Sequence, residues 1–257
     1  MLRPHHLLFY GSLLLSRLSD QVLLFLVPLV VYQRTGSAAW TGVAFFVETL
    51  ARFLACPVCG VLSDRHPPLR LLRQSQTLRA LSCAAGLVAG FTLGGQAALV
   101  ALVLVSAACG VFTIQGVMAR EVLLPHLFPG ERFERVLAHA QLADQLGMVA
   151  GPALAAAALA LWPWQGVLGC SALLFVLADA GLIWWQRHHT APLPQGHHTP
   201  GESLWVPLGT ALRHILHLSG LKPLIALAAG VNLVVGVTQA TAAAMTVSYT
   251  HLRAHET

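Results

Sequence analysis

The sequence predicts an all-α membrane protein, and three observations carry this prediction. Of the 257 residues, 56% are hydrophobic and only 10% are charged, whereas soluble globular domains carry roughly 25% charged residues. The apolar residues are gathered into segments long enough for an α-helix to cross a bilayer. The basic residues are concentrated in every second connection between these segments, which is typical of a multi-pass membrane protein.

The apolar segments predict seven membrane-spanning helices. A helix needs about 20 residues to cross the hydrocarbon core. The first segment is too long for a signal peptide and lacks a small-residue cleavage site, so we expect it to be a true span. The predicted spans are residues 7–33, 39–62, 71–93, 96–118, 137–161, 165–186 and 221–246.

The distribution of basic residues predicts the orientation of the spans. The connections after spans one, three and five are short, and they hold a single basic residue, Arg34. The positive-inside rule therefore places the N-terminus and the even-numbered connections in the cytoplasm. The basic residues in or beside those parts are Arg3, Arg65, Arg70, Arg73, Arg79, Arg120, Arg132, Arg135, Arg187, Arg213 and Lys222.

Changes in composition divide the chain into four segments. Residues 1–186 are expected to form a six-helix transmembrane bundle, and residues 187–220 a cytoplasmic Pro-, Gly- and His-rich linker with an amphipathic helix. Residues 221–246 are expected to be the first helix of a second bundle. Residues 247–257 are polar and have no turn pattern, so we interpret them as a non-native tail.

The connection between spans two and three carries the sequence GVLSDRHPPLR, residues 60–70. Its Gly60, Asp64 and Arg65 resemble the signature loop of the major facilitator superfamily, although prolines and a leucine replace the glycine and basic residues that follow in the family. Arg70 supplies the missing charge one turn later. The resemblance implies a gating latch, in which an acid at a helix end pairs with an arginine. The alternative is a tight loop with positive-inside arginines.

Span five contains Gly147, Gly151 and Pro152, which resemble the antiporter motif of drug exporters in this family. The alternative is ordinary small-residue helix packing. Residues 7–246 as a whole are similar to the bacterial branch that contains enterobactin and macrolide exporters. This resemblance implies twelve spans, a central cavity and proton-coupled export from the cytoplasmic membrane. The expected fold is thus the N-terminal six-helix bundle of the major facilitator fold plus a seventh helix, with the second half missing.

Charged residues inside the spans are the candidates for binding protons or substrate charges, because such residues are costly in a bilayer and face the bundle interior. Arg17 and Asp20 lie three residues apart, and Glu48 and Arg52 four apart, so each pair can also neutralise itself structurally. Asp144 has no partner within its own helix, and we expect it to meet Arg17 across the cavity. A carboxylate there could change its protonation between the two faces.

Span four departs from the resemblance. Exporters of the family often carry an arginine ahead of a Gln-Gly pair in this span, and it is linked to proton transfer. Here Gln115 and Gly116 are present without that arginine. Two alternatives follow: the protein lacks proton coupling, or the coupling depends on Arg17 or Arg52 instead.

The sequence contains no pattern of an enzyme. Cys56 and Cys59 have the spacing of a metal or redox pair, but they lie inside a span without a second pair, so we interpret them as packing residues. Catalytic triads, Walker motifs and zinc patterns are absent from the sequence, and no cofactor is expected. The net charge of +5 follows from membrane topology and does not indicate a nucleic-acid partner.

These observations predict a secondary transporter that exports an amphipathic small molecule, such as an antibiotic or a siderophore, driven by a proton gradient. Its partners are the substrate and the bilayer, and the complete protein is expected to be a monomer. The alternatives are an uptake transporter of the same fold, a non-transporting membrane protein, and an inert truncated fragment.

Overall fold

The computed structural model describes residues 4–128, 132–189 and 192–195, with four isolated positions beyond them, Gly209, Pro223, Leu227 and Gly230. Within these residues the chain forms six α-helices and one short 3-10 helix, with no strand. The prediction of an all-α fold is therefore confirmed. The amphipathic helix, the seventh span at 221–246 and the tail at 247–257 lie outside the described residues, apart from the isolated positions.

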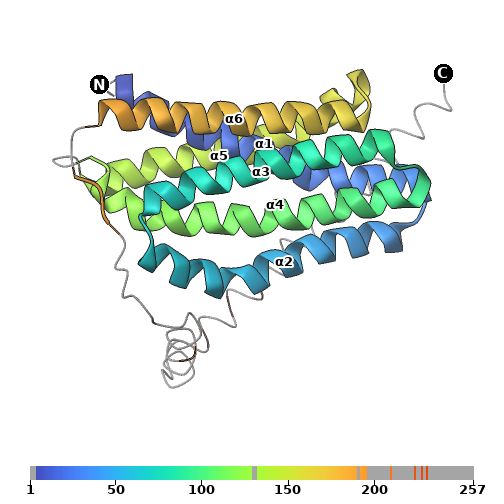
Figure 1. Cartoon of the computed structure of the whole chain (residues 1–257), viewed down its shortest axis with the longest axis horizontal. Helices are drawn as coiled ribbons and strands as arrows, with labels where there is room; N and C mark the ends of the chain where they lie inside the picture. The colour runs from blue at the N-terminus through green and yellow to red at the C-terminus, as the bar shows by residue number, and fades with distance from the viewer. Residues whose placement is uncertain are drawn as a thin grey trace.

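Each of the first six predicted spans corresponds to one helix (Figure 1). The helices extend two to four residues beyond the predicted apolar segments at several ends, because polar residues continue a helix once it has left the hydrocarbon core. The elements are α1 (Pro4–Thr35), α2 (Ala38–Arg65), α3 (Pro68–Thr92), α4 (Gly95–Leu123), η1 (Leu124–His126), α5 (Phe133–Leu161) and α6 (Trp164–His188).

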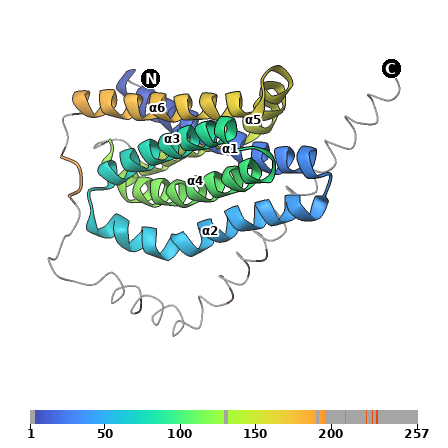
Figure 2. The same cartoon turned by 45° about the vertical axis from the view of Figure 1, so that its right-hand side comes forward.

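Five of the six helices are long and apolar enough to cross a membrane by themselves, and α3 is the exception. Arg70, Arg73 and Arg79 lie in its first half and lower its hydropathy. The helix is nevertheless a full member of the bundle, since it packs between α4 and α6 (Figures 1 and 2). Neighbouring helices thus neutralise charges that the bilayer alone would not accept.

Four of the other five helices pack around α1, namely α5, α6, α2 and α4. Of the most apolar window of α1, 67% is buried inside the bundle, compared with 17% for α2 and 22% for α5. The two flanking helices therefore expose most of their surface, and α1 forms the interior. Figure 2 shows α2 at the opposite edge of the bundle from α6.

Two short connections depend on glycine. Gly36, between α1 and α2, has a φ of 64°, and Gly95, the first residue of α4 after the α3–α4 connection, has a φ of 57°. Residues other than glycine rarely adopt this left-handed backbone conformation. Gly36 also donates its backbone N–H to the carbonyl of Tyr32 at 2.8 Å, which closes the last turn of α1. The predicted tight connections are therefore formed by the backbone that the glycines allow.

The core consists of two hydrophobic clusters at opposite ends of the bundle. The first surrounds Leu26, Leu168 and Phe175, and the second surrounds Phe9 and Trp185. Between the clusters the helices carry polar and charged side chains. We call this set the central polar layer; its members are Ser16, Arg17, Asp20, Gln21, Gln76, Arg79, Thr113, Arg120 and Asp144.

Candidate functional site

Asp20 of α1 is the most completely satisfied acid of the central polar layer. Its Oδ2 lies 2.7 Å from Nη1 of Arg79 in α3, and both side chains are almost fully buried. Its Oδ1 accepts a hydrogen bond from the Thr113 hydroxyl of α4 at 2.9 Å. One carboxylate therefore joins three helices, and the partner of Asp20 is Arg79 and not the neighbouring Arg17.

The guanidinium of Arg79 is fully engaged as well. It donates to the backbone carbonyl of Ser75 at 3.1 Å and to Oε1 of Gln76 at 2.9 Å. Its carbon lies 4.6 Å from the ring centroid of Phe175 in α6, in a cation–π arrangement. This pair holds the bundle together and has little freedom to exchange partners.

Glu48 and Arg52 form the pair within α2 that their spacing allows. Nη2 of Arg52 lies 2.6 Å from Oε1 of Glu48, and the Ser106 hydroxyl of α4 donates to the other carboxylate oxygen. The side chain of Arg52 lies across Gly110 of α4, where a Cβ would come within 2.9 Å of its Cγ. The absence of a side chain at Gly110 of α4 therefore leaves space for the ion pair of α2, which lies against α4.

Asp144 of α5 has a different partner from the expected one. The expectation that it meets Arg17 is wrong, because its Oδ2 lies 2.7 Å from Nη1 of Arg120 in α4. Arg120 also binds the exposed Glu121 at 2.8 Å. The carboxylate of Asp144 is 19% exposed, compared with 5% for Asp20. Among the acids of the polar layer, Asp144 is thus the one that water reaches most easily.

Arg17 of α1 is left without a carboxylate. Its Nε is buried without a hydrogen-bond partner, and its Nη2 lies 3.9 Å from the sulfur of Met148, a weak acceptor. No ion pair joins it to another residue in the described part of the chain. Its stem passes over Gly147 of α5, where a Cβ would come within 2.9 Å of the Arg17 Cγ.

These side chains converge on a small cavity of about 30 Å³ in the middle of the bundle. Pockets for drug-sized molecules measure about 300–1,000 Å³. The cavity that the described residues form is therefore too small to hold a drug-sized molecule by itself. The charged residues that line the cavity are Arg17, Asp20, Arg79, Arg120 and Asp144.

The residues of the antiporter-like motif pack α5 against α1. Gly151 lies directly on Gln21, and a Cβ at that position would collide with the Gln21 Cβ. Gly147 faces Arg17 and the backbone of Leu18 in the same way. Pro152 follows inside the helix. Close approach of two helices is the role that small residues at this spacing serve in membranes.

The signature-like loop lies at the end of the bundle where α2 gives way to α3. Gly60, Asp64 and Arg65 belong to the last turns of α2, and Arg70 to the first turn of α3. Asp64 is exposed and makes no ion pair with any other residue that the structure describes. A latch within the described residues is therefore not formed by Asp64.

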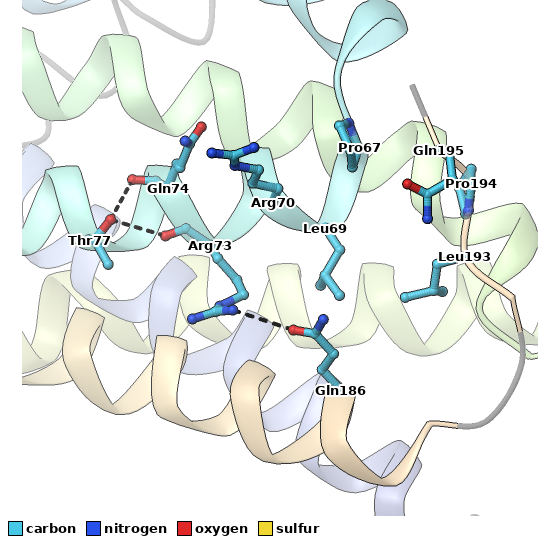
Figure 3. Close-up of a pocket in the computed structure, with 10 residues that line it drawn as sticks. All are labelled: Pro67, Leu69, Arg70, Arg73, Gln74, Thr77, Gln186, Leu193, Pro194 and Gln195. Atoms are coloured by element: carbon cyan, nitrogen blue, oxygen red, sulfur yellow. Dashed lines mark hydrogen bonds between the residues drawn. The ribbon is translucent and has the colours of Figure 1, made fainter. Parts of the chain in front are cut away.

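A larger hollow of about 530 Å³ lies beside this loop, between α3, α6 and residues 193–195. Figure 3 shows Arg73 reaching toward Gln186 of α6, while Arg70 and Gln74 point away from Gln186. Arg73 also binds Asp179 of α6 at 3.1 Å. The carboxylate of Asp179 in α6 is therefore neutralised by an arginine of α3.

Sequence reasoning missed Arg79 and Arg120 as members of the site, because the positive-inside rule assigns both to the cytoplasmic basic residues. A signal is present for Arg79, since it lies well inside the predicted span 71–93, and Arg120 follows the predicted span 96–118 closely. An arginine inside a span needs a buried acid as a partner.

Two comparisons with known proteins bear on this site. The sequence model of the Major Facilitator Superfamily matches residues 9–255. The fold is similar to the crystal structure of a mutant peptide transporter POT in complex with sulfate, with a TM-score of 0.51 and 13% sequence identity. That match covers 85% of this chain and 45% of the transporter, so the chain spans less than half of the transporter's length. No curated protein matches the sequence.

Proposed function

The chain belongs to the major facilitator superfamily, and from this membership we propose that it acts as a secondary active transporter which exports amphipathic small molecules, such as drugs or siderophores. Transport proceeds by alternating access between two bundles, with protons moving inward in exchange. The site of action is the cytoplasmic membrane of a bacterium, with the N-terminus in the cytoplasm. The energy source is the proton gradient without a cofactor, and the complete protein works as a monomer.

The observation that supports this proposal best is the group of ionisable residues around the central cavity. Asp20, Arg79, Asp144, Arg120 and Arg17 all line one small space between the helices. Charges in the middle of membrane helices are costly and are kept where they serve a substrate or ion pathway or a structural pair. Structural pairing explains Asp20 with Arg79 and also accounts for the more open pair of Asp144 and Arg120, but it leaves Arg17 without a carboxylate among the described residues.

Within this proposal Asp144 is the proton carrier. Its carboxylate is partly exposed to the cavity, and its ion pair with Arg120 joins α4 to α5. Protonation of Asp144 would release Arg120, which keeps Glu121 as a second partner at 2.8 Å. The arginine therefore keeps a carboxylate partner when it releases Asp144. Asp20 has no such alternative, because its two oxygens are held by Arg79 and Thr113.

Gly60, Asp64, Arg65 and Arg70 form the gating loop of the proposed cycle. The exposed carboxylate of Asp64 stands at the C-terminal end of α2, where the helix dipole disfavours a negative charge. A cation supplied by another part of the complete transporter would stabilise it in one of the two states. Formation and rupture of that contact would then follow the opening of the cytoplasmic side.

The proposal is tested by reconstituting the complete gene product into liposomes that contain a pH-sensitive dye. Amphipathic candidate substrates should cause proton movement only in the presence of the protein and a substrate gradient. A complete lack of proton movement with every candidate would contradict the proposal. Counterflow of a radiolabelled substrate in right-side-out and inverted vesicles then distinguishes export from uptake.

A further inference from the structure

The ion pairs between the described helices leave one interior arginine without an acidic partner. Asp20, Glu48 and Asp144 are the acids near the middle of α1, α2 and α5, and each already binds an arginine at 2.6–2.7 Å. Asp179 of α6 binds Arg73 in the same way. Among the described membrane-spanning residues, Arg17 is the interior arginine that no carboxylate neutralises.

The position of Arg17 makes its charge available to a ligand. Its Nε is buried without a partner, and its terminal nitrogen meets only the thioether of Met148. Because Gly147 has no side chain, the stem of Arg17 packs closely against α5, and Arg17 is one of the residues that line the cavity. An unsatisfied buried donor is costly, so a hydrogen-bond acceptor that enters the cavity gains this free energy.

The side chains that line the cavity carry more positive than negative charges. Three arginines and two aspartates line it: Arg17, Arg79, Arg120, Asp20 and Asp144. A cationic substrate would have to displace an arginine from an acid before it could bind there. An anionic substrate meets a free guanidinium, whose planar arrangement of donors matches a carboxylate or a phosphate.

The neighbours of Arg17 suit an amphipathic molecule. Met148 is 37% exposed, and its flexible thioether adapts to apolar groups of different shapes. An apolar body could therefore lie along α5 while its charged end binds Arg17.

We propose that Arg17 is an anion-binding subsite of the transport cavity and that the transported molecules are amphipathic organic anions. This inference rests on the proposed transport function and specifies its substrate class. A carboxylate that binds the Arg17 guanidinium through both of its oxygens would replace the contact to Met148 and accept the hydrogen bonds that the guanidinium otherwise lacks. Arg17 is then a substrate-binding residue, separate from the proton-carrying pair of Asp144 and Arg120.

The test uses two probes that share one ring and differ in charge, 2-naphthoate and 2-naphthylmethylammonium. Equilibrium dialysis measures their binding to the complete protein in lipid nanodiscs, and empty nanodiscs correct for partition into lipid. The expected result is a dissociation constant at least about tenfold lower for the anion, a difference of about 1.4 kcal/mol. This preference should disappear in Arg17→Gln and persist in part in Arg17→Lys.

The matched control is Arg132→Gln, which removes the same charge from a side chain that is 82% exposed before α5. It should retain the preference for the anion. Circular dichroism and size-exclusion chromatography check that Arg17→Gln is folded. If Arg17→Gln does not fold, Arg17→Lys is compared with the unmodified protein instead, because this variant keeps the positive charge. Equal or tighter binding of the cation, survival of the preference in Arg17→Gln, or no binding of either probe would overturn the inference.

A second measurement separates this inference from the proposed function. Both probes are assayed for transport in proteoliposomes with an imposed proton gradient. Proton-coupled movement of the cation would overturn the anion subsite and leave the transport function intact. Binding of the anion through Arg17 without movement in either direction would contradict the transport function and retain the subsite as a binding site.

Discussion

The carboxylate of Asp20 in α1 lies 2.7 Å from the guanidinium of Arg79 in α3, and both side chains are almost completely buried. Thr113 of α4 binds the other carboxylate oxygen at 2.9 Å, and Phe175 of α6 lies 4.6 Å from the guanidinium. Four helices therefore meet at one ion pair. A charge that loses its partner at this depth is stabilised only by neutral hydrogen-bonding groups, Thr113 for Asp20 and Ser75 and Gln76 for Arg79.

Removing one partner of this pair should destabilise the bundle more than removing both. Asp20→Ala leaves Arg79 charged and unpaired, and breaking a buried pair in this way costs about 3–5 kcal/mol. The double variant Asp20→Asn with Arg79→Gln keeps hydrogen-bonding groups without charge, so we expect it to unfold at a higher temperature than Asp20→Ala. Thermal unfolding in detergent measures the difference. Equal melting temperatures for the two variants would refute a stabilising role of the ion pair.

Neutralising Asp144 should affect transport and not the stability of the bundle. Asp144→Asn keeps a hydrogen-bond acceptor for Arg120, and the site is open enough for water to enter. The variant should therefore fold normally but lose proton-coupled transport to the level of protein-free liposomes, while downhill substrate exchange continues. Dye-monitored proton flux and counterflow measure the two activities.

Glu134→Gln is the control for this experiment, because its carboxylate is 79% exposed at the start of α5. It removes one negative charge from the same helix without touching the cavity. If Asp144→Asn retains full proton coupling, the carrier is a different group.

The helices could be predicted from sequence, because apolar length and the positions of polar connections determine them. All six segments between residues 7 and 186 form helices. The third is the least apolar, and the positive-inside rule groups its Arg79 with the cytoplasmic charges although this residue lies within the predicted span. The structure shows why a bilayer accepts this residue: Asp20 neutralises it from a helix that is remote in sequence.

The pairing of the charges could be predicted only where it is local. Glu48 and Arg52 are one helical turn apart, and the spacing alone brings them together. Arg17 and Asp20 have a similar spacing, yet they separate, since α3 offers Asp20 a buried arginine and α5 offers Arg17 the open space at Gly147. Contacts between helices depend on rotation about each helix axis, which one sequence without its packing does not determine.

The basic connections predict the orientation of the bundle, and cysteine labelling tests this prediction. In a background without the five native cysteines, Gln96→Cys places a thiol at the first turn of α4, and Arg132→Cys places one before α5. A membrane-impermeant maleimide should label the first in intact cells, and the second only after the membrane is permeabilised. The reverse pattern would place the N-terminus outside the cytoplasm.

The close contact between α5 and α1 predicts that Gly151 cannot be replaced even by alanine without loss of stability. A Cβ at Gly151 would collide with the Gln21 Cβ and also lie 3.4 Å from the Gln21 backbone. Because backbone atoms cannot swing away, α5 has to shift, and overpacking of this kind typically costs about 1–3 kcal/mol.

Gly60 provides the matched control, because it also lies inside a helix but a Cβ at this position would meet no heavy atom of the described residues within 4 Å. Gly60→Ala should therefore be neutral or should stabilise α2 by up to about 1 kcal/mol, since alanine is the better helix former. The melting temperatures of the two variants decide the question. If Gly60→Ala is the more damaging change, the glycine of the signature-like loop serves a contact that exists only in the complete transporter. If Gly151→Ala is the more damaging one, the antiporter-like motif acts through helix packing.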